Sequence, residues 1–174
     1  MKLERHWCMP NANTFSMKPV SDLLDEILGE EPAEGWLDPF ARTAKRASIT
    51  NDLNPDYDTT YNMEALELAL LLAERHDFFN GILYDPPYSP RQVSACYQGV
   101  GSKTTAHDTS SGWGERMKDA LADLVAPGGL VISFGWNSGG FGMCRGFHIE
   151  RIILLAHGGA HNDTIITVER KVND

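Results

Sequence analysis

FNGILYDPPYSP, residues 79–90, is the stretch that decides which fold we expect for this chain. The segment GILY at 81–84 is apolar and is followed at once by turn-forming residues, a pattern typical of a buried strand. The adjacent prolines Pro86 and Pro87 end that strand, because proline has no main-chain N–H to donate. Asp85 is therefore expected at the carboxyl end of the strand, which in α/β sheets is the side where ligands bind.

Short apolar runs alternate with helical patterns along the rest of the chain. Besides GILY, the runs that we expect to form strands are 35–38, 48–51, 60–63, 130–135, 148–156 and 164–169. One helix is expected after Ser21, which can act as its N-cap, and before Gly29, which is placed to end it. Two more helices are expected over 63–76 and 114–125, where apolar residues recur at helical spacing.

This alternation predicts an α/β fold with a doubly wound, mostly parallel, seven-stranded sheet. The connection HGGAHND between the last two expected strands is too short for a crossover helix, so these strands should form a C-terminal antiparallel hairpin at the sheet edge. With 174 residues, of which 42% are hydrophobic, the chain is expected to fold as a single domain over residues 1–174.

Composition excludes several classes of protein. No window resembles a membrane span or a secretory signal, so we expect a soluble, cytoplasmic protein without a membrane partner. Three cysteines without a CxxC pair argue against a disulfide framework and a thiolate zinc site. His157, His161 and Asp163 are interpreted as turn residues, and no metal site is expected. Because the net charge is −9, any nucleic acid should meet a local basic patch or bind through another subunit.

The Asp-Pro-Pro-Tyr segment suits a substrate that carries two N–H bonds on one nitrogen. Residues before proline are held extended, so the Asp85 carboxylate and the Pro86 carbonyl can both accept hydrogen bonds at one place. The exocyclic amine of a nucleobase has two such N–H bonds, and Tyr88 offers a face on which an extruded base can stack. The alternative is that the segment is only a rigid loop, with Tyr88 as a packing residue.

At these residues the sequence resembles the amino-methyltransferases of DNA, whose hallmark is an (Asp/Asn/Ser)-Pro-Pro-(Tyr/Phe/Trp) segment after a strand of the S-adenosylmethionine-dependent methyltransferase fold. Together with PGGLVISFGWNS at 127–138, the chain looks most like small adenine N6-methyltransferases of bacteriophage type. The resemblance implies methyl transfer from S-adenosylmethionine to a flipped-out adenine of DNA. It also implies that the catalytic segment consists of Asp85, Pro86, Pro87 and Tyr88.

Further positions resemble the cofactor motifs of that family. FSMKP at 15–19 is similar to the segment near the methionine end of the cofactor, and LDPFA at 37–41 is similar to the motif of the first strand. Asp52 takes the place of the acidic residue that holds the ribose hydroxyls, and Glu64 stands near the place of the adenine. The cofactor-binding residues that the resemblance implies are Phe15, Lys18, Pro19, Asp38, Pro39, Phe40, Asp52, Glu64 and Asp85.

Two features depart from the family pattern. The loop after the first strand reads FARTAKR at 40–46, without the glycines that let a backbone approach the cofactor, so Arg42 and Thr43 are expected to shape it differently. A separate target-recognition domain is also missing from this sequence. We therefore expect the polar, glycine-rich loops 97–113 and 135–147, both placed on the ligand side of the sheet, to substitute for it.

In these loops and beside the motif, Arg91, Lys103 and Arg145 are candidates for phosphate contacts, and Trp136 or Phe141 for stacking on bases. The loops could equally be covers that close over the cofactor. A homodimer would help to assemble a recognition surface. Other activities also remain open: a degenerate fold that acts as a binding or regulatory subunit, or a methyltransferase for RNA or a protein amide.

Overall fold

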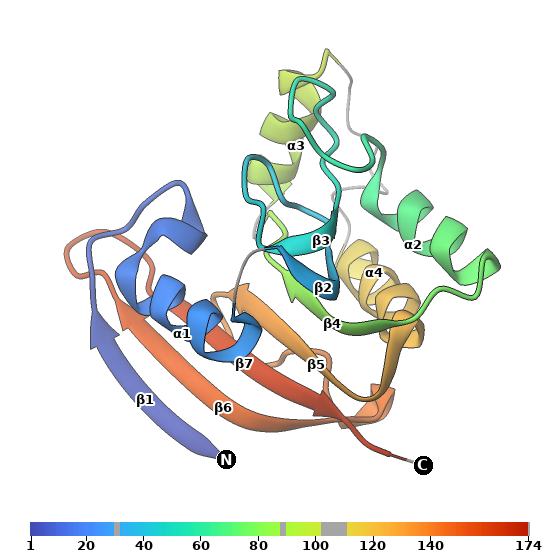
Figure 1. The fold of residues 1–174 in the computed structure, drawn as a ribbon. Helices are drawn as coiled ribbons and strands as arrows, with labels where there is room; N and C mark the ends of the chain where they lie inside the picture. Colours follow the sequence, from blue (N-terminus) through green and yellow to red (C-terminus); the bar gives the residue numbers. More distant parts are fainter. Residues whose placement is uncertain (30–31, 88–89, 102–110, 174) are drawn as a thin grey trace.

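The computed structural model describes residues 1–29, 32–87, 90–101 and 111–173. Within them, seven strands form one sheet in the order β1-β6-β7-β5-β4-β2-β3 (Figure 1). The strands are β1 (Lys2–Trp7), β2 (Ala33–Asp38), β3 (Ala47–Thr50), β4 (Phe79–Tyr84), β5 (Val125–Gly135), β6 (Phe147–Ala156) and β7 (Thr164–Lys171). Only β7 runs against its neighbours, because it is antiparallel to both β5 and β6. The mostly parallel seven-stranded sheet is therefore confirmed.

Helices cover both faces of this sheet (Figure 1). On one face, α1 (Lys18–Leu28) packs against side chains that include Leu83 and Ile132. On the other face, α2 (Ala65–Glu74) and α4 (Ser111–Leu124) pack against side chains that include Ile82 and Val131. Because neighbouring residues of a strand point to opposite faces, GILY is buried on both sides, as a central parallel strand should be.

The sheet differs from the expectation at both of its edges. β1 was not expected, because its sequence KLERHW is mostly polar, and it pairs with β6 as an exposed edge strand whose Glu4 forms an ion pair with Arg151. The antiparallel pair β6–β7 is confirmed, but it is not at the edge, since β7 lies between β5 and β6. Residues 60–63 form no strand; Tyr61 makes an isolated bridge with Asn51.

Helix ends also differ in part. α1 begins at Lys18 with Met17 as its N-cap, so Ser21 lies inside the helix and does not cap it. Gly29 ends this helix with a positive φ of 72°, as expected. A further helix, α3 (Pro90–Gly99), forms beside the Asp-Pro-Pro segment, so the expected loop at 97–113 is helical at both of its described ends. Residues 102–110 within that loop lie outside the described residues.

The connection between β5 and β6 lies differently from the expectation. β5 and β6 point in the same direction, because both are antiparallel to β7, so residues 136–146 must pass from the carboxyl end of β5 to the amino end of β6. They do so without an α-helix, and they place Phe141 in the same hydrophobic cluster as Met117 and Leu121 of α4. This segment, called here the 136–146 crossover, therefore covers one face of the sheet and is not a loop confined to the ligand side.

Candidate functional site

Three carboxylates gather at the carboxyl ends of adjacent strands. Asp38 is the last residue of β2, Asp52 follows β3, and Asp85 follows β4. The negative charges of Asp85 and Asp52 both contribute to raising the pKa of Asp38, although burial is the larger cause. Asp85 thus lies at the carboxyl end of its strand, as the sequence predicts, and Asp38 and Asp52 are at the same edge of the sheet.

Asp38 is an acid buried within the protein, with an exposed fraction of 0%. Its Oδ1 accepts a hydrogen bond from the Phe40 main-chain N–H at 3.1 Å, whereas Oδ2 has no hydrogen-bond partner within the described chain. An ionised carboxylate is costly in such a place unless it is paired. Burial accordingly raises its pKa well above the ordinary value. Oδ2 is therefore a buried acceptor without a partner in the described chain, and Asp38 itself lines neither of the two cavities described below.

Asp52 holds the loop that follows β2. Its Oδ2 accepts the Arg42 main-chain N–H at 3.1 Å, and its Oδ1 accepts the Asn54 N–H at 2.9 Å. Arg42 has a φ of 52°, the left-handed region that glycine enters most readily. The glycine-free loop thus takes a glycine-like conformation at Arg42, which agrees with the expectation that Arg42 shapes this loop.

Asn51 is a site residue that the sequence did not point out. It is fully buried, and its amide donates to the carbonyls of Pro39 and Met63, both at 3.1 Å, while its Oδ1 accepts from the Met63 N–H at 3.2 Å. This side chain ties together the turn after β2, the end of β3 and the segment before α2. The available signal was an asparagine as the last residue of the strand expected over 48–51.

Two cavities lie on either side of the Asp-Pro-Pro segment and share Phe40. The first, called here the N-terminal cavity, is lined by residues 12–15, 40–44 and Asp85. The second, called here the α3 cavity, is lined by Pro39, Phe40, Asn51, Asp52, Leu53, Met63, Glu64, Ala65, Pro87, Val93, Cys96 and Tyr97. Asp85 therefore faces one cavity and Pro87 the other. An elongated ligand that occupied both would pass over Phe40.

Glu64 has a local structural role in the α3 cavity. Its Oε2 accepts the N–H of Leu66 at 2.6 Å, so it caps α2, and its Oε1 accepts the Tyr97 hydroxyl at 3.5 Å. Burial raises the pKa of this carboxyl. Tyr97 and Cys96 come from α3, which was not expected, so sequence reasoning missed the wall that they form.

The N-terminal motif is only partly in the site. Phe15 lines the N-terminal cavity, and its ring packs against Phe134 at a centroid distance of 5.2 Å. Lys18 does not point there: its side chain is 85% exposed and forms an ion pair with Asp22 at 2.8 Å. Pro19 occupies the first turn of α1. The structure thus brings Phe15 to the cavity and leaves Lys18 on the surface.

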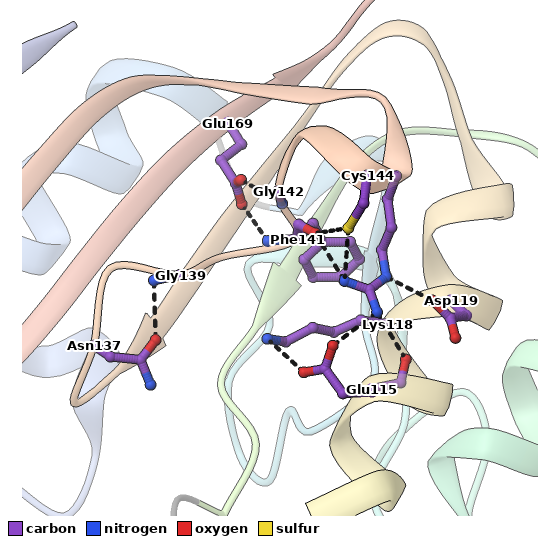
Figure 2. A network of polar contacts seen from close by, with 10 residues as sticks. Glu115, Lys118, Asp119, Asn137, Gly139, Phe141, Gly142, Cys144 and Glu169 are labelled. Carbon is purple, nitrogen blue, oxygen red and sulfur yellow. Dashed lines mark hydrogen bonds and ion pairs between the residues drawn. The ribbon is translucent and has the colours of Figure 1, made fainter.

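Phe141 is not available to stack on a base. Of the two stacking candidates that the sequence offered, Trp136 and Phe141, the second is therefore wrong. It is 1% exposed, and its ring packs edge-on against Tyr84 at 5.3 Å and against Phe147 at 5.5 Å. Its N–H donates to the buried carboxylate of Glu169 at 2.7 Å, and the Gly142 N–H donates to the same carboxylate at 2.9 Å (Figure 2). A side chain at Gly140 would overlap this carboxylate. Glu169 therefore pins the 136–146 crossover to β7.

The charged candidates for phosphate contacts differ in their surroundings. Arg145 is partly buried and already paired: it forms ion pairs with Glu115 at 2.9 Å and Asp119 at 2.7 Å and donates to the Phe141 carbonyl. Its side chain is only 12% exposed, so a role in phosphate binding is not supported. Arg91 is exposed on α3, and Trp136 is 44% exposed at the end of β5. Lys103 and Tyr88 lie outside the described residues.

The described residues contain neither a metal-binding cluster nor a membrane-spanning helix. No group of three or more histidine, cysteine, aspartate or glutamate side chains in that part of the chain is arranged to hold a metal ion. No helix there is both long enough and apolar enough to cross a bilayer.

His157 has a packing role: its Nδ1 contacts the Cys8 carbonyl at 2.9 Å and its Nε2 contacts the Thr164 hydroxyl at 2.9 Å.

Only the comparison with solved structures gives matches, and these matches identify the fold. No family model matches the sequence, and no curated protein matches it. Among solved structures, the N-methyltransferase NodS from Bradyrhizobium japonicum, in complex with S-adenosylhomocysteine, matches with a TM-score of 0.55 and 12% identity, covering 92% of this chain and 89% of that one. The 1,6-didemethyltoxoflavin-N1-methyltransferase from Burkholderia thailandensis matches with a TM-score of 0.56 and 15% identity, covering 90% and 78%.

TrmN from Thermus thermophilus also matches, with a TM-score of 0.52 and 14% identity, over 90% of this chain. This chain spans 49% of TrmN, and it spans about half the length of two other matched structures. At these identities the similarity extends to the fold alone. The sheet and its covering helices thus have the fold of the S-adenosylmethionine-dependent methyltransferases.

Proposed function

We propose that this chain transfers a methyl group from S-adenosylmethionine to the N6 amine of adenine in DNA. The observation that carries the proposal is the position of the Asp-Pro-Pro segment. It follows β4 at the carboxyl side of a methyltransferase-type sheet, with Asp85 lining one cavity and Pro87 lining the next. This position supports the proposal, because ligands of such sheets bind at the carboxyl ends of the strands.

The residues present fit the cofactor. The α-ammonium group of its methionine part is a cationic donor that would satisfy the buried Oδ2 atom of Asp38, which has no partner in the described chain. In this assignment, Asp52 accepts hydrogen bonds from the ribose hydroxyls. The adenine is surrounded by Glu64 and by the apolar side chains that line the α3 cavity. The N-terminal cavity, with Phe15 and Asp85, takes the methionine end. When bound, this cofactor supplies an electrophilic methyl group on a sulfonium centre.

Asp85 and the Pro86 carbonyl act on the acceptor. The amine lone pair of adenine is delocalised into the ring, which makes it a poor nucleophile. Hydrogen bonds from its two N–H groups to the Asp85 carboxylate and the Pro86 carbonyl favour a pyramidal nitrogen and offset the positive charge that develops on it. With the cofactor bound, the nitrogen lone pair would form the new N–C bond as the C–S bond breaks with its electrons left on sulfur, and the nitrogen held by Asp85 and the Pro86 carbonyl would lose one N–H proton to solvent.

Contacts with DNA belong to the same proposal. A target adenine must leave the base stack to reach Asp85, so aromatic faces near the site are needed to receive it or its neighbours. Trp136 is an exposed aromatic residue at the end of β5, and Tyr88 follows the prolines in sequence. Arg91 on α3 is an exposed cation near the same segment. We assign Trp136 to stacking and Arg91 to a phosphate contact.

Methyl transfer to defined nucleic acids tests the proposal. Labelled S-adenosylmethionine is incubated with the protein and with unmethylated duplex DNA, single-stranded DNA or RNA, and the modified nucleoside is identified by mass spectrometry. We expect N6-methyladenine in DNA. Asp85→Ala should abolish transfer while cofactor binding, measured by calorimetry, stays within about threefold. Asp77→Ala, which changes an aspartate outside both cavities, serves as the control. Transfer only to RNA, or full activity of Asp85→Ala, would reject the assignment.

A further inference from the structure

Arg42 connects the two walls of the N-terminal cavity. One wall consists of residues 12–15, which precede α1, and the other consists of residues 40–44, which follow β2. The Arg42 guanidinium crosses between them and donates from Nη1 to the Ala12 carbonyl at 2.8 Å. At the same time its main-chain N–H donates to Asp52 Oδ2 at 3.1 Å. One residue thus links the N-terminal segment, the β2 loop and the carboxylate after β3.

The backbone conformation of Arg42 is one that favours glycine, so the presence of an arginine side chain there calls for a reason. A φ of 52° is unfavourable for a residue with a Cβ atom, and glycine would adopt it without that penalty. Among the described residues, Arg42 and His76 are the non-glycine residues with such a φ. If the loop served only as a turn, glycine would be the more stable choice at this position. The guanidinium is therefore the part of Arg42 that needs an explanation.

We infer that Arg42 is a positioning residue for the cofactor: it holds residues 12–15 as a cover over the methionine end of the cavity. The inference rests on the proposed function only for the identity of the ligand. The cover that it holds includes Phe15, whose ring packs against Phe134 and which lines the same cavity as Asp85. The short 3₁₀ helix Thr14–Ser16 keeps the cover compact through the Ser16 N–H and the Asn13 carbonyl, which are 3.0 Å apart.

The substitution Arg42→Gly separates this role from a merely structural one. It removes the guanidinium and at the same time relieves the positive φ, so the free energy of unfolding should rise or stay unchanged. Cofactor affinity should move the other way: the dissociation constant for S-adenosylhomocysteine, measured by calorimetry, should rise about three- to tenfold with the loss of one hydrogen bond from a charged donor. Hydrogen exchange in residues 12–17 should become faster in the unliganded variant.

A control variant removes the same charge from the same loop. Lys45 forms an ion pair with Asp58 and does not line the N-terminal cavity, so Lys45→Gly should leave the dissociation constant unchanged. An Arg42→Gly protein that binds S-adenosylhomocysteine as tightly as the wild type, with unchanged exchange in residues 12–17, would overturn the inference. If the wild type binds S-adenosylhomocysteine but does not methylate DNA, the inference stands and the proposed substrate is rejected. If the wild type fails to bind it, both are rejected.

Discussion

The buried carboxylate of Glu169 on β7 accepts the main-chain N–H of Phe141 at 2.7 Å, in a segment whose regular structure is limited to the short 3₁₀ helix Met143–Arg145. A second N–H, from Gly142, donates to the same group. Both donors belong to the 136–146 crossover, which passes over one face of the sheet without an α-helix. A single buried acid thus supplies the acceptor for two main-chain N–H groups that a crossover helix would have paired internally.

Glu169→Ala should therefore destabilise the protein strongly. The change leaves two N–H groups without their acceptor, of which that of Phe141 is buried, and an unpaired buried donor costs about 1–3 kcal/mol. We expect the free energy of unfolding, from denaturant titration, to fall by about 2–4 kcal/mol. Glu150→Ala breaks the partly exposed ion pair with Arg170 and should cost less than about 1 kcal/mol. Equal losses in the two variants would show that Glu169 does not anchor the crossover.

Asp38→Asn should change stability and cofactor affinity in opposite directions. The folded-state pKa of Asp38 lies above its value in the unfolded chain, because burial and then Asp85 and Asp52 disfavour the charged form. The contribution of this group to stability is therefore complete below the unfolded pKa and is lost as pH rises through the folded pKa. Asparagine keeps an acceptor for the Phe40 N–H and does not ionise. The unliganded variant should therefore be more stable than the wild type at pH values above the folded-state pKa of Asp38, where the wild-type carboxyl is charged.

Cofactor binding by the same variant should be weaker by about tenfold or more, since a neutral amide cannot pair with an ammonium group as a carboxylate does. In the wild type, affinity should increase as pH rises through the Asp38 pKa, because the charged form binds the cation. Calorimetric titration with S-adenosylhomocysteine across this range measures both effects. A wild-type affinity that does not change with pH, or an unchanged affinity of Asp38→Asn, would remove Asp38 from the cofactor site.

Cys96 offers a direct test of where the ligand lies. It is exposed on α3 and lines the α3 cavity, whereas Cys144 is exposed on the 136–146 crossover and lines neither cavity. Burial raises the pKa of the Cys96 thiol, so alkylation is best followed at mildly alkaline pH. Saturating S-adenosylhomocysteine should slow the alkylation of Cys96, followed by peptide mass spectrometry, and leave Cys144 unaffected. Equal rates with and without ligand would place the adenosine elsewhere.

The sequence was informative where local chemistry and periodicity act together. GILY is an apolar run that the two prolines end, and the acids at 38, 52 and 85 stand at the ends of such runs. Their position at one edge of the sheet follows from parallel pairing. Sequence patterns failed where tertiary contacts override local preference. β1 is polar and owes its place to pairing with β6, and α3 is a short helix next to prolines. The roles of Glu169 and Arg145 depend on partners more than 20 residues away in sequence, so no local pattern could reveal them.

Arg145 and Arg91 should respond differently to substitution, although both were candidates for phosphate contacts. Arg145 is bound to Glu115 and Asp119 of α4 and to the Phe141 carbonyl, so Arg145→Ala should lower the free energy of unfolding by about 1 kcal/mol and leave the salt dependence of DNA binding unchanged. Arg91 is exposed on α3, beside the Asp-Pro-Pro segment.

If Arg91 meets a phosphate, Arg91→Ala should weaken binding similarly for all DNA sequences and should reduce the slope of log affinity against log salt concentration by about 0.9, the value for one released counterion on duplex DNA. Fluorescence anisotropy with a labelled duplex at several salt concentrations measures that slope, and denaturant titration measures stability. A flattened slope for Arg145→Ala with unchanged stability would reverse the assignment, because it would mean that the ion pairs with α4 open when DNA binds.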